Sequence, residues 1–144
     1  MESWSVAPPQ STILVLEDDR ALAELVCIYL EGAGYQVLTA HNVDHGIRLA
    51  TAHPECVEML LTDVSVPGAT ATKVSALFAA LGRPTRCLYM SGRPRAMIPA
   101  QDLLIPGADL LEKPFSEIQL VEKVRQTLAT AAPTAPSILG AAGL

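Results

Sequence analysis

Short apolar runs that end on polar residues recur along this chain. Residues 59–62 form an apolar run too short for a helix, within a strand expected over 57–62, and this run leads directly into Asp63. Three further runs end in a similar way: 12–16 before Glu17-Asp18-Asp19, 85–90 before Ser91-Gly92, and 109–111 before Glu112-Lys113-Pro114. A buried strand that ends on an acid is typical of the functional edge of an open α/β sheet. If these strands lie parallel, their polar ends meet at one edge.

Between these runs, apolar residues recur at the three- and four-residue spacing of amphipathic helices. The pattern predicts a further strand over 36–40, and helices over 20–33, 43–53, 70–81 and from a Ser116 cap to about 129. On the first helix, Leu22, Leu25, Val26 and Leu30 are among the residues expected to face inward. Residues 93–106 contain three prolines, so any helix there should be short, distorted or mobile.

The alternation of strands and helices predicts an α/β fold with a doubly wound, five-stranded parallel sheet. We expect the flavodoxin-like strand order 2-1-3-4-5, which places the first and third strands side by side where the winding reverses. Glu17, Asp18 and Asp63 would gather there. The domain is expected over residues 12–130, after a flexible lead-in over 1–11 and before a disordered tail or linker over 131–144.

Composition narrows the function classes. The chain has 144 residues, enough for one domain, and its net charge of −5 argues against a nucleic-acid surface. The start lacks the features of a signal peptide, and no segment approaches the ~20 apolar residues of a membrane helix, so we expect a cytoplasmic protein without membrane contact. Cys27, Cys56 and Cys87 are interpreted as buried thiols in a reducing compartment.

Four motifs stand in the order and spacing of a known family: Glu17-Asp18, Asp63 followed by Pro67-Gly68, Ser91-Gly92, and Lys113-Pro114-Phe115. Together they resemble a receiver (response regulator) domain of two-component signalling over about residues 12–130. The strings 61–64, 88–92 and 111–115 are most similar to the receivers at the C-terminus of hybrid sensor histidine kinases.

The resemblance implies a Mg²⁺-dependent phosphoacceptor site. Asp63 would accept a phosphoryl group, and Asp18 and Asp63 would ligate Mg²⁺ directly. The backbone carbonyl of Ser65 would be the third protein ligand, and Glu17 would hold a metal-bound water. Hard oxygen ligands of this kind suit Mg²⁺. Without the metal, the clustered acids should repel one another and raise at least one pKa.

Lys113 and Ser91 complete the expected site. Lys113 would pair with the Asp63 carboxylate at rest and with a phosphoryl oxygen afterwards, and the Lys113-Pro114 bond is expected to be cis. The Ser91 hydroxyl would bind another phosphoryl oxygen. The domain would itself catalyse part of the transfer, which is chiefly a matter of positioning and charge neutralisation.

Each motif alone has a simpler explanation. The acids after the first strand could merely favour a helix start, and Asp19 is expected to be such a cap. Asp63 could be an Asx-turn residue, and Lys113 a surface lysine before a proline. The coincidence of the motifs at four strand ends favours the phosphoacceptor interpretation.

The chain departs from the family pattern at three places. Leu110 stands where many receivers have an aromatic residue that reports phosphorylation. Residues 69–72 read Ala-Thr-Ala-Thr instead of containing an Asp-Gly pair, which could shift the following helix start. Arg93 lies two residues after Ser91, where it could influence access of water to an acyl phosphate.

The phosphodonor would be a histidine kinase or a histidine phosphotransfer protein, because His41, His45 and His53 do not suggest an internal donor. Phosphorylation would switch partner interactions, with residues 93–106 as the responsive surface. A homodimer would also be compatible with the resemblance. The alternative is a receiver-like interaction module that acts without phosphate. A phosphatase of the haloacid dehalogenase type is disfavoured, because Ser65 stands where that class needs a second acid.

Overall fold

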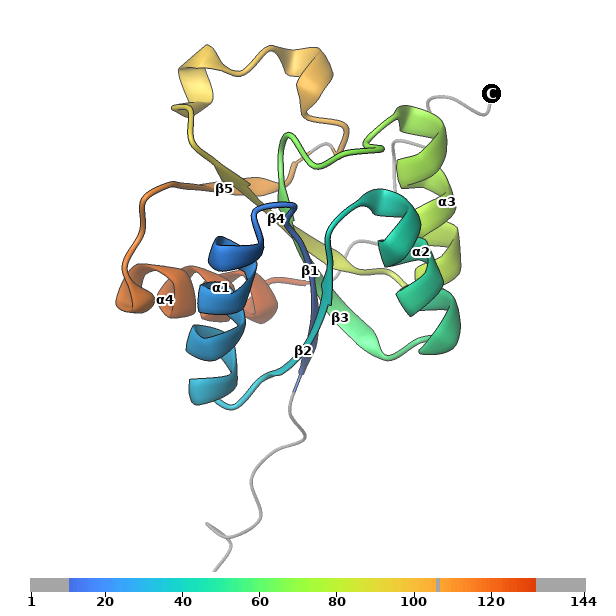
Figure 1. Cartoon of the computed structure of the whole chain (residues 1–144), viewed down its shortest axis with the longest axis horizontal. Helices are drawn as coiled ribbons and strands as arrows, with labels where there is room; N and C mark the ends of the chain where they lie inside the picture. The colour runs from blue at the N-terminus through green and yellow to red at the C-terminus, as the bar shows by residue number, and fades with distance from the viewer. Residues whose placement is uncertain (1–10, 106, 132–144) are drawn as a thin grey trace, which may run out of the picture.

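The computed structural model describes residues 11–105 and 107–131, which form a parallel sheet between two layers of helices (Figure 1). The order of the five strands is β2-β1-β3-β4-β5, as expected from the sequence. The strands are β1 (Thr12–Leu16), β2 (Gln36–Ala40), β3 (Val57–Asp63), β4 (Arg86–Ser91) and β5 (Asp109–Glu112). The helices are α1 (Arg20–Gly32), α2 (Val43–Ala52), α3 (Ala71–Leu81) and α4 (Glu117–Ala129).

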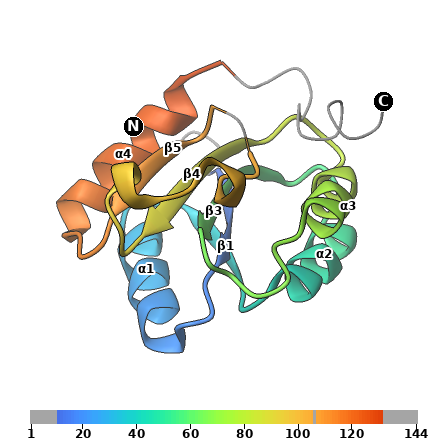
Figure 2. The ribbon, with the colours of Figure 1, turned by 90° about the horizontal axis from the view of Figure 1, so that it is seen from above.

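The core has two halves, one on each face of the sheet. Figure 2 shows α1 and α4 on one side and α2 and α3 on the other. Because successive side chains of a strand point to opposite faces, Ile13 packs with the α1 and α4 residues and Leu14 with the α2 and α3 residues. Both halves are fully apolar at their centres, which fixes the strand register and therefore the positions of the strand ends.

Side-chain caps determine where the helices begin. Asp19 accepts a hydrogen bond from the Leu22 amide at 3.1 Å and caps α1, as predicted. Thr70 caps α3, so this helix begins at Ala71 even though the chain lacks the expected Asp-Gly pair. Ser116 caps α4 with a full capping box.

Residues 93–105 contain only two short 3₁₀ turns, Arg95–Met97 and Ala100–Asp102. This result confirms the expectation of a short helix at most between β4 and β5. Among the described residues, no helix is long and apolar enough to cross a membrane. The predicted lead-in lies outside the described residues except for Ser11, and the predicted tail lies outside them except for Ala131.

Two expectations about burial are wrong. Leu25 was expected to face inward, but it is 39% exposed because α1 turns Ala23, Val26 and Leu30 toward the sheet instead. Cys56 is exposed because it lies in the turn before β3. Cys27 and Cys87 are half-buried free thiols, and burial raises the pKa of both.

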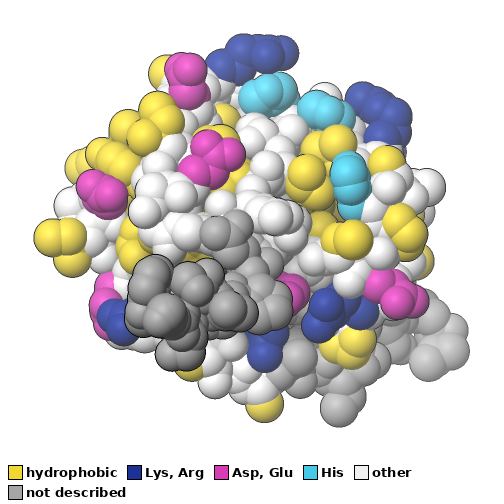
Figure 3. Space-filling model, turned by 90° about the horizontal axis from the view of Figure 1, so that it is seen from below, with side chains coloured by type: hydrophobic (Ala, Val, Ile, Leu, Met, Phe, Trp, Pro, Cys, Tyr) yellow, Lys and Arg dark blue, Asp and Glu magenta, His cyan; other side chains and the backbone are white. Residues whose placement is uncertain are grey.

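Charged side chains of both signs share the surface. On the face in Figure 3, Lys and Arg side chains are separated by acidic, histidine and apolar side chains. A nucleic-acid surface needs clustered basic side chains, and this face does not display such a cluster. The absence of a nucleic-acid partner therefore stays a prediction, consistent with the net charge of −5.

Replacing Leu30 by Ala should lower the free energy of unfolding by about 3 kcal/mol, because Leu30 is fully buried and the change leaves a cavity. Leu25→Ala, on the same helix, should cost less than about 1 kcal/mol, because this side chain is partly exposed already. Denaturant unfolding monitored by circular dichroism measures both. Equal losses would contradict the orientation of α1.

Candidate functional site

The candidate site residues lie at the carboxyl ends of four neighbouring strands. The pairs β1–β3, β3–β4 and β4–β5 are all parallel, so these ends share one edge of the sheet. Glu17 and Asp18 follow β1, Asp63 ends β3, Ser91 ends β4 and Lys113 follows β5. The expected convergence of these residues is therefore present in the structure.

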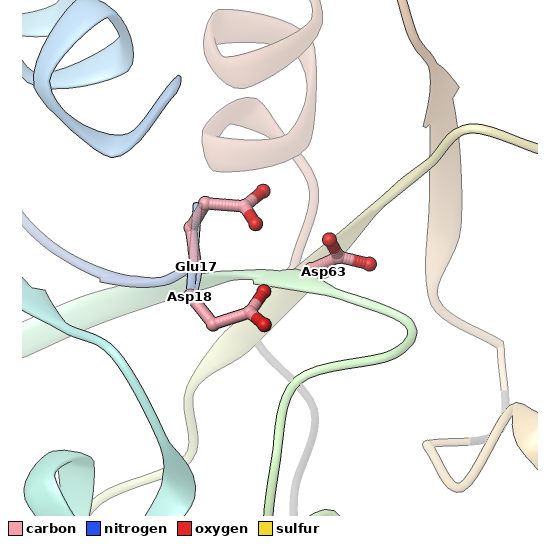
Figure 4. A group of neighbouring side chains, drawn as sticks. All are labelled: Glu17, Asp18 and Asp63. Atoms are coloured by element: carbon pink, nitrogen blue, oxygen red, sulfur yellow. The ribbon is translucent and has the colours of Figure 1, made fainter. Parts of the chain in front are cut away.

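Three carboxylates gather at this edge. Figure 4 shows Glu17 and Asp18 at the end of β1 with their side chains directed toward Asp63. One carboxylate oxygen from each residue lies within 4.8 Å of the others. Asp18 is exposed and, among residues 11–105 and 107–131, has no cation within salt-bridge distance. The cluster thus holds a carboxylate whose charge no lysine or arginine of the described chain balances.

Lys113 links two of these acids. Its Nζ donates to Asp63 Oδ2 at 2.7 Å and to Glu17 Oε1 at 2.9 Å. The Lys113 amide donates to the Ser91 carbonyl at 2.7 Å, and the Lys113-Pro114 bond is cis, as expected. The sequence had predicted the contact with Asp63, but the contact with Glu17 was not anticipated. The Lys113-Pro114-Phe115 motif does not indicate that the lysine side chain also reaches Glu17 at the end of β1.

Asp63 is held from two sides. Its side chain is 12% exposed, and its Oδ1 accepts from the Ser65 amide at 2.9 Å. The simpler Asx-turn explanation of Asp63 therefore describes a real contact, but the same carboxylate also binds Lys113. Because each oxygen is fixed by one donor, the carboxylate has a defined orientation at the strand end.

Glu17 is the most buried acid of the site, with 1% of its surface exposed. Its Oε2 accepts from the Asp19 amide at 3.2 Å, and its backbone carbonyl contacts His41 Nδ1 at 2.9 Å. His41 was not predicted as part of this edge. Its position directly after the second strand was the available signal, because β2 pairs in parallel with β1 and ends beside Glu17.

The acids differ in pKa because their surroundings differ. Burial raises the pKa of Glu17 above its ordinary value, and the hydrogen bonds from Lys113 and Asp19 offset this only in part. Burial acts likewise on Asp63, but hydrogen bonds from Lys113 and Ser65 outweigh it and hold the pKa of Asp63 below its ordinary value. The pKa of one acid is raised, as expected, but burial and not repulsion between the acids is the main cause.

Burial affects the pKa of the Lys113 ammonium in the direction opposite to its effect on the acids. Burial alone would lower its pKa, but the hydrogen bonds to Asp63 and Glu17 raise it above the ordinary value of a lysine. Lys113 therefore stays protonated at neutral pH. One positive charge thus faces the two most buried carboxylates of the cluster.

Ser91 and Ser65 border the cluster in different ways. Ser91 is 2% exposed, and its Oγ accepts from the Arg93 amide at 2.9 Å. Its hydroxyl proton is therefore not used in that contact. Ser65 is exposed and contributes its amide to Asp63. The role of the Ser65 carbonyl as a metal ligand stays a prediction.

The donor set suits a hard divalent cation. Carboxylate oxygens are the ligands that Mg²⁺ and Ca²⁺ prefer, and Mg²⁺ usually keeps several waters besides one or two carboxylates. Here three carboxylates lie together, and no Cys or His belongs to the cluster. The exposure of Asp18 leaves a path from solvent to the cluster. The site therefore fits a partly hydrated Mg²⁺ better than a zinc ion.

Comparisons with known proteins agree with this geometry. A family model described as "Response regulator receiver domain" matches residues 13–125. The transcriptional regulatory protein FixJ of Azorhizobium caulinodans is 28% identical over 130 residues, covering 87% of this chain and 58% of FixJ. The chain spans about half the length of the curated relatives it matches, between 47% and 58% for the first three.

Solved structures show the same fold. The receiver domain of the hybrid histidine kinase CckA is 26% identical, with a TM-score of 0.66 over 82% of this chain and 99% of that domain. The chemotaxis protein CheY4 of Vibrio cholerae is 19% identical, with a TM-score of 0.70 over 82% of this chain and 98% of CheY4.

Proposed function

This chain belongs to the response regulator receiver domain family, and from that membership we propose that it is a phosphoacceptor in a two-component phosphorelay. Asp63 would take a phosphoryl group from a phosphohistidine in a Mg²⁺-dependent reaction. The donor would be a histidine kinase or a histidine phosphotransfer protein. Phosphorylation would then change the interactions of the chain with its partners.

One observation carries this proposal: a lysine at the end of β5 bridges two acids at the ends of β1 and β3, beside a third acid that forms no ion pair with the described residues. Lys113 Nζ lies 2.7 Å from Asp63 and 2.9 Å from Glu17. Burying charges is costly unless each is compensated, so a merely structural core would not favour this arrangement. A site that holds a divalent cation and offers a lysine to an incoming phosphoryl group needs both the acids and the lysine.

Asp18 and Asp63 would hold the metal, with the Ser65 carbonyl as a further ligand and Glu17 acting through a bound water. When bound, Mg²⁺ would offset the negative charge of the carboxylates and of the incoming phosphoryl group. With the metal offsetting this charge, the Lys113 ammonium could leave its contact with Asp63 and bind a phosphoryl oxygen instead.

The chain's own residues would carry the transfer. An Asp63 carboxylate oxygen would bond to phosphorus as the phosphorus–nitrogen bond of the phosphohistidine breaks, and the imidazole would leave with the bonding electrons. Lys113 would exchange its contact with Asp63 Oδ2 for one with a phosphoryl oxygen. The Ser91 hydroxyl, whose proton is not engaged by Arg93, would donate to another.

The setting of the reaction is part of the proposal. The likeness to the CckA receiver supports a place for this chain within or beside a hybrid histidine kinase, in the cytoplasm. The extent of the domain, residues 12–130, is supported by the family match over 13–125. A phosphate-independent interaction module is not favoured, because such a module has no need of the complete set of acids and lysine.

The test is phosphorylation of the full chain by a small donor. The chain is incubated with Mg²⁺ and acetyl phosphate, and its intact mass should increase by one phosphoryl group. Borohydride reduction followed by peptide mapping should locate the modification at residue 63. If the folded chain gains no phosphoryl group at saturating Mg²⁺, the phosphate-independent alternative replaces this proposal.

Asp18→Asn should remove the stabilisation of the chain by Mg²⁺ without lowering its stability in EDTA. Asp18 is exposed and makes no ion pair with the described residues, so its loss costs the metal-free fold nothing. In the wild type, Mg²⁺ at a hundred times its Kd should add about 2.7 kcal/mol. Thermal unfolding with and without Mg²⁺ measures both effects.

Asp19→Asn is the matched control for this prediction. It removes the neighbouring negative charge but keeps a side-chain oxygen for the helix cap, since Asn caps as well as Asp. Its Mg²⁺ response should equal that of the wild type. An equal loss of response in both variants would assign the effect to net charge and not to ligation by Asp18.

A further inference from the structure

Tyr89 connects the end of β4 to the segment that follows it. Tyr89 lies two residues before Ser91 in β4, and residues two apart in a strand project from the same face. Tyr89 is 5% exposed and packs in a small cluster with Val64 and Ile98. Its hydroxyl oxygen accepts a hydrogen bond from the Ile105 amide at 3.2 Å.

Residues 93–105 are attached to the site at both ends. At the start, the Arg93 amide donates to Ser91 Oγ at 2.9 Å, and near the end Ile105 is bound to Tyr89. Arg93 Nη2 also lies 3.5 Å from Asp102 Oδ2, which joins the two ends of the segment. Inside the segment only two 3₁₀ turns form, and Ile98 packs against Tyr89, so the side-chain contacts at its two ends help to hold it in position.

The segment also forms part of the wall next to the acceptor. A cavity of about 20 Å³ is lined by Asp63, Tyr89, Leu104 and Ile105 among others. This volume holds about one water molecule, so Asp63 and the segment face each other across a narrow space. A change at Asp63 can therefore reach Leu104 and Ile105 across a short distance.

We infer that Tyr89 couples the state of Asp63 to residues 93–105 by holding the Ile105 amide. This inference rests on the proposed phosphoacceptor function. A phosphoryl group on Asp63 would draw the Ser91 hydroxyl toward it, which disturbs the Arg93 contact and the end of β4. Leu110, the β5 residue in register with Tyr89, has no polar group for this role. The Tyr89 hydroxyl therefore connects strand and segment.

Hydrogen–deuterium exchange on the full chain tests the inference, with Tyr89→Phe as the variant. Exchange is followed over residues 93–105 in Mg²⁺, with and without beryllofluoride as a phosphoryl mimic. In the wild type, beryllofluoride should change exchange at Ile105. In Tyr89→Phe without beryllofluoride, the Ile105 amide should exchange about fivefold faster than in the wild type, as expected for one lost hydrogen bond. Adding beryllofluoride to this variant should change the exchange rate of the Ile105 amide only slightly.

Phosphoryl incorporation, measured by intact mass, separates this inference from the proposed function. Tyr89→Phe should still accept one phosphoryl group from acetyl phosphate, because the hydroxyl that this change removes is bonded to the Ile105 amide and not to a carboxylate. Tyr35→Phe, in the loop between α1 and β2, controls for loss of a phenol elsewhere and should respond like the wild type. If Tyr89→Phe is phosphorylated and keeps the wild-type exchange response, the coupling role is overturned. If the wild type takes no phosphoryl group, both proposals fail.

Discussion

Asp63→Asn should abolish phosphoryl incorporation from acetyl phosphate. The carboxamide has the shape of the carboxylate but lacks the charged oxygen that attacks phosphorus. The carboxamide oxygen of the variant can still accept from the Ser65 amide, so the turn after β3 is preserved. Intact mass with Mg²⁺ should therefore show full modification of the wild type and none of the variant.

This variant should also fold, at a modest cost. Its amide group would face the Lys113 ammonium, which loses an ionic hydrogen bond of 2.7 Å, and we expect a loss of about 1–3 kcal/mol. Asp109→Asn is the matched control, since Asp109 is exposed and pairs with Lys123 instead of with the cluster. That control should be modified like the wild type. A folded Asp63→Asn chain that still gains a phosphoryl group would place the acceptor at another residue.

The sequence predicted the parts of this protein that local pattern and parallel topology determine. Apolar runs ending on acids identified the strands, and a parallel sheet brings all such ends to one edge. This argument placed Asp63 and Lys113, 50 residues apart, at the same edge, and the resemblance to receiver domains implied that the two side chains pair there. The cap at Asp19 followed from the residue type and its place before a helix.

The remaining features depend on side-chain packing, which the pattern does not specify. The exposure of Leu25 results from the rotation of α1, which a periodicity of apolar residues defines only within about one position. The hydrogen bond from Lys113 to Glu17 depends on how far β1 and β5 extend along the shared edge of the sheet. The bond between Tyr89 and Ile105 joins a strand to a segment without regular structure, and the sequence contains no periodic signal for such a contact.

Lys113→Met should lower the free energy of unfolding by about 3–5 kcal/mol at pH 7 in EDTA. The side chain of Lys113 is 19% exposed, and it is the cation paired with both Glu17 and Asp63. Removing one partner of a buried ion pair leaves the other charge buried without compensation. Denaturant unfolding monitored by circular dichroism measures the loss. Because Met fills nearly the same volume as the lysine stem, a cavity does not explain the effect.

Lys123→Met is the matched control for this loss. Lys123 pairs with Asp109 at 2.7 Å, but the Asp109 side chain is 54% exposed and the pair is screened by solvent. Its removal should cost less than about 1 kcal/mol. If the two lysine variants lose equal stability, the ion pairs of Lys113 are no more than surface contacts.

The cost of Lys113→Met should shrink as the pH falls from 7 toward 4. Lys113 helps to hold the pKa of Asp63 below its ordinary value, so the contribution of Asp63 to stability stays constant over this range and is lost only at lower pH, as the pH falls through the folded value. The change between pH 7 and 4 therefore comes from Glu17. Without Lys113, the pKa of Glu17, already raised by burial, should rise further, so this acid becomes neutral first. Protonation then removes the uncompensated charge that destabilises the variant. Unfolding curves for wild type and variant should therefore converge at low pH, and a gap that stays constant with pH would assign the loss to packing of the lysine stem.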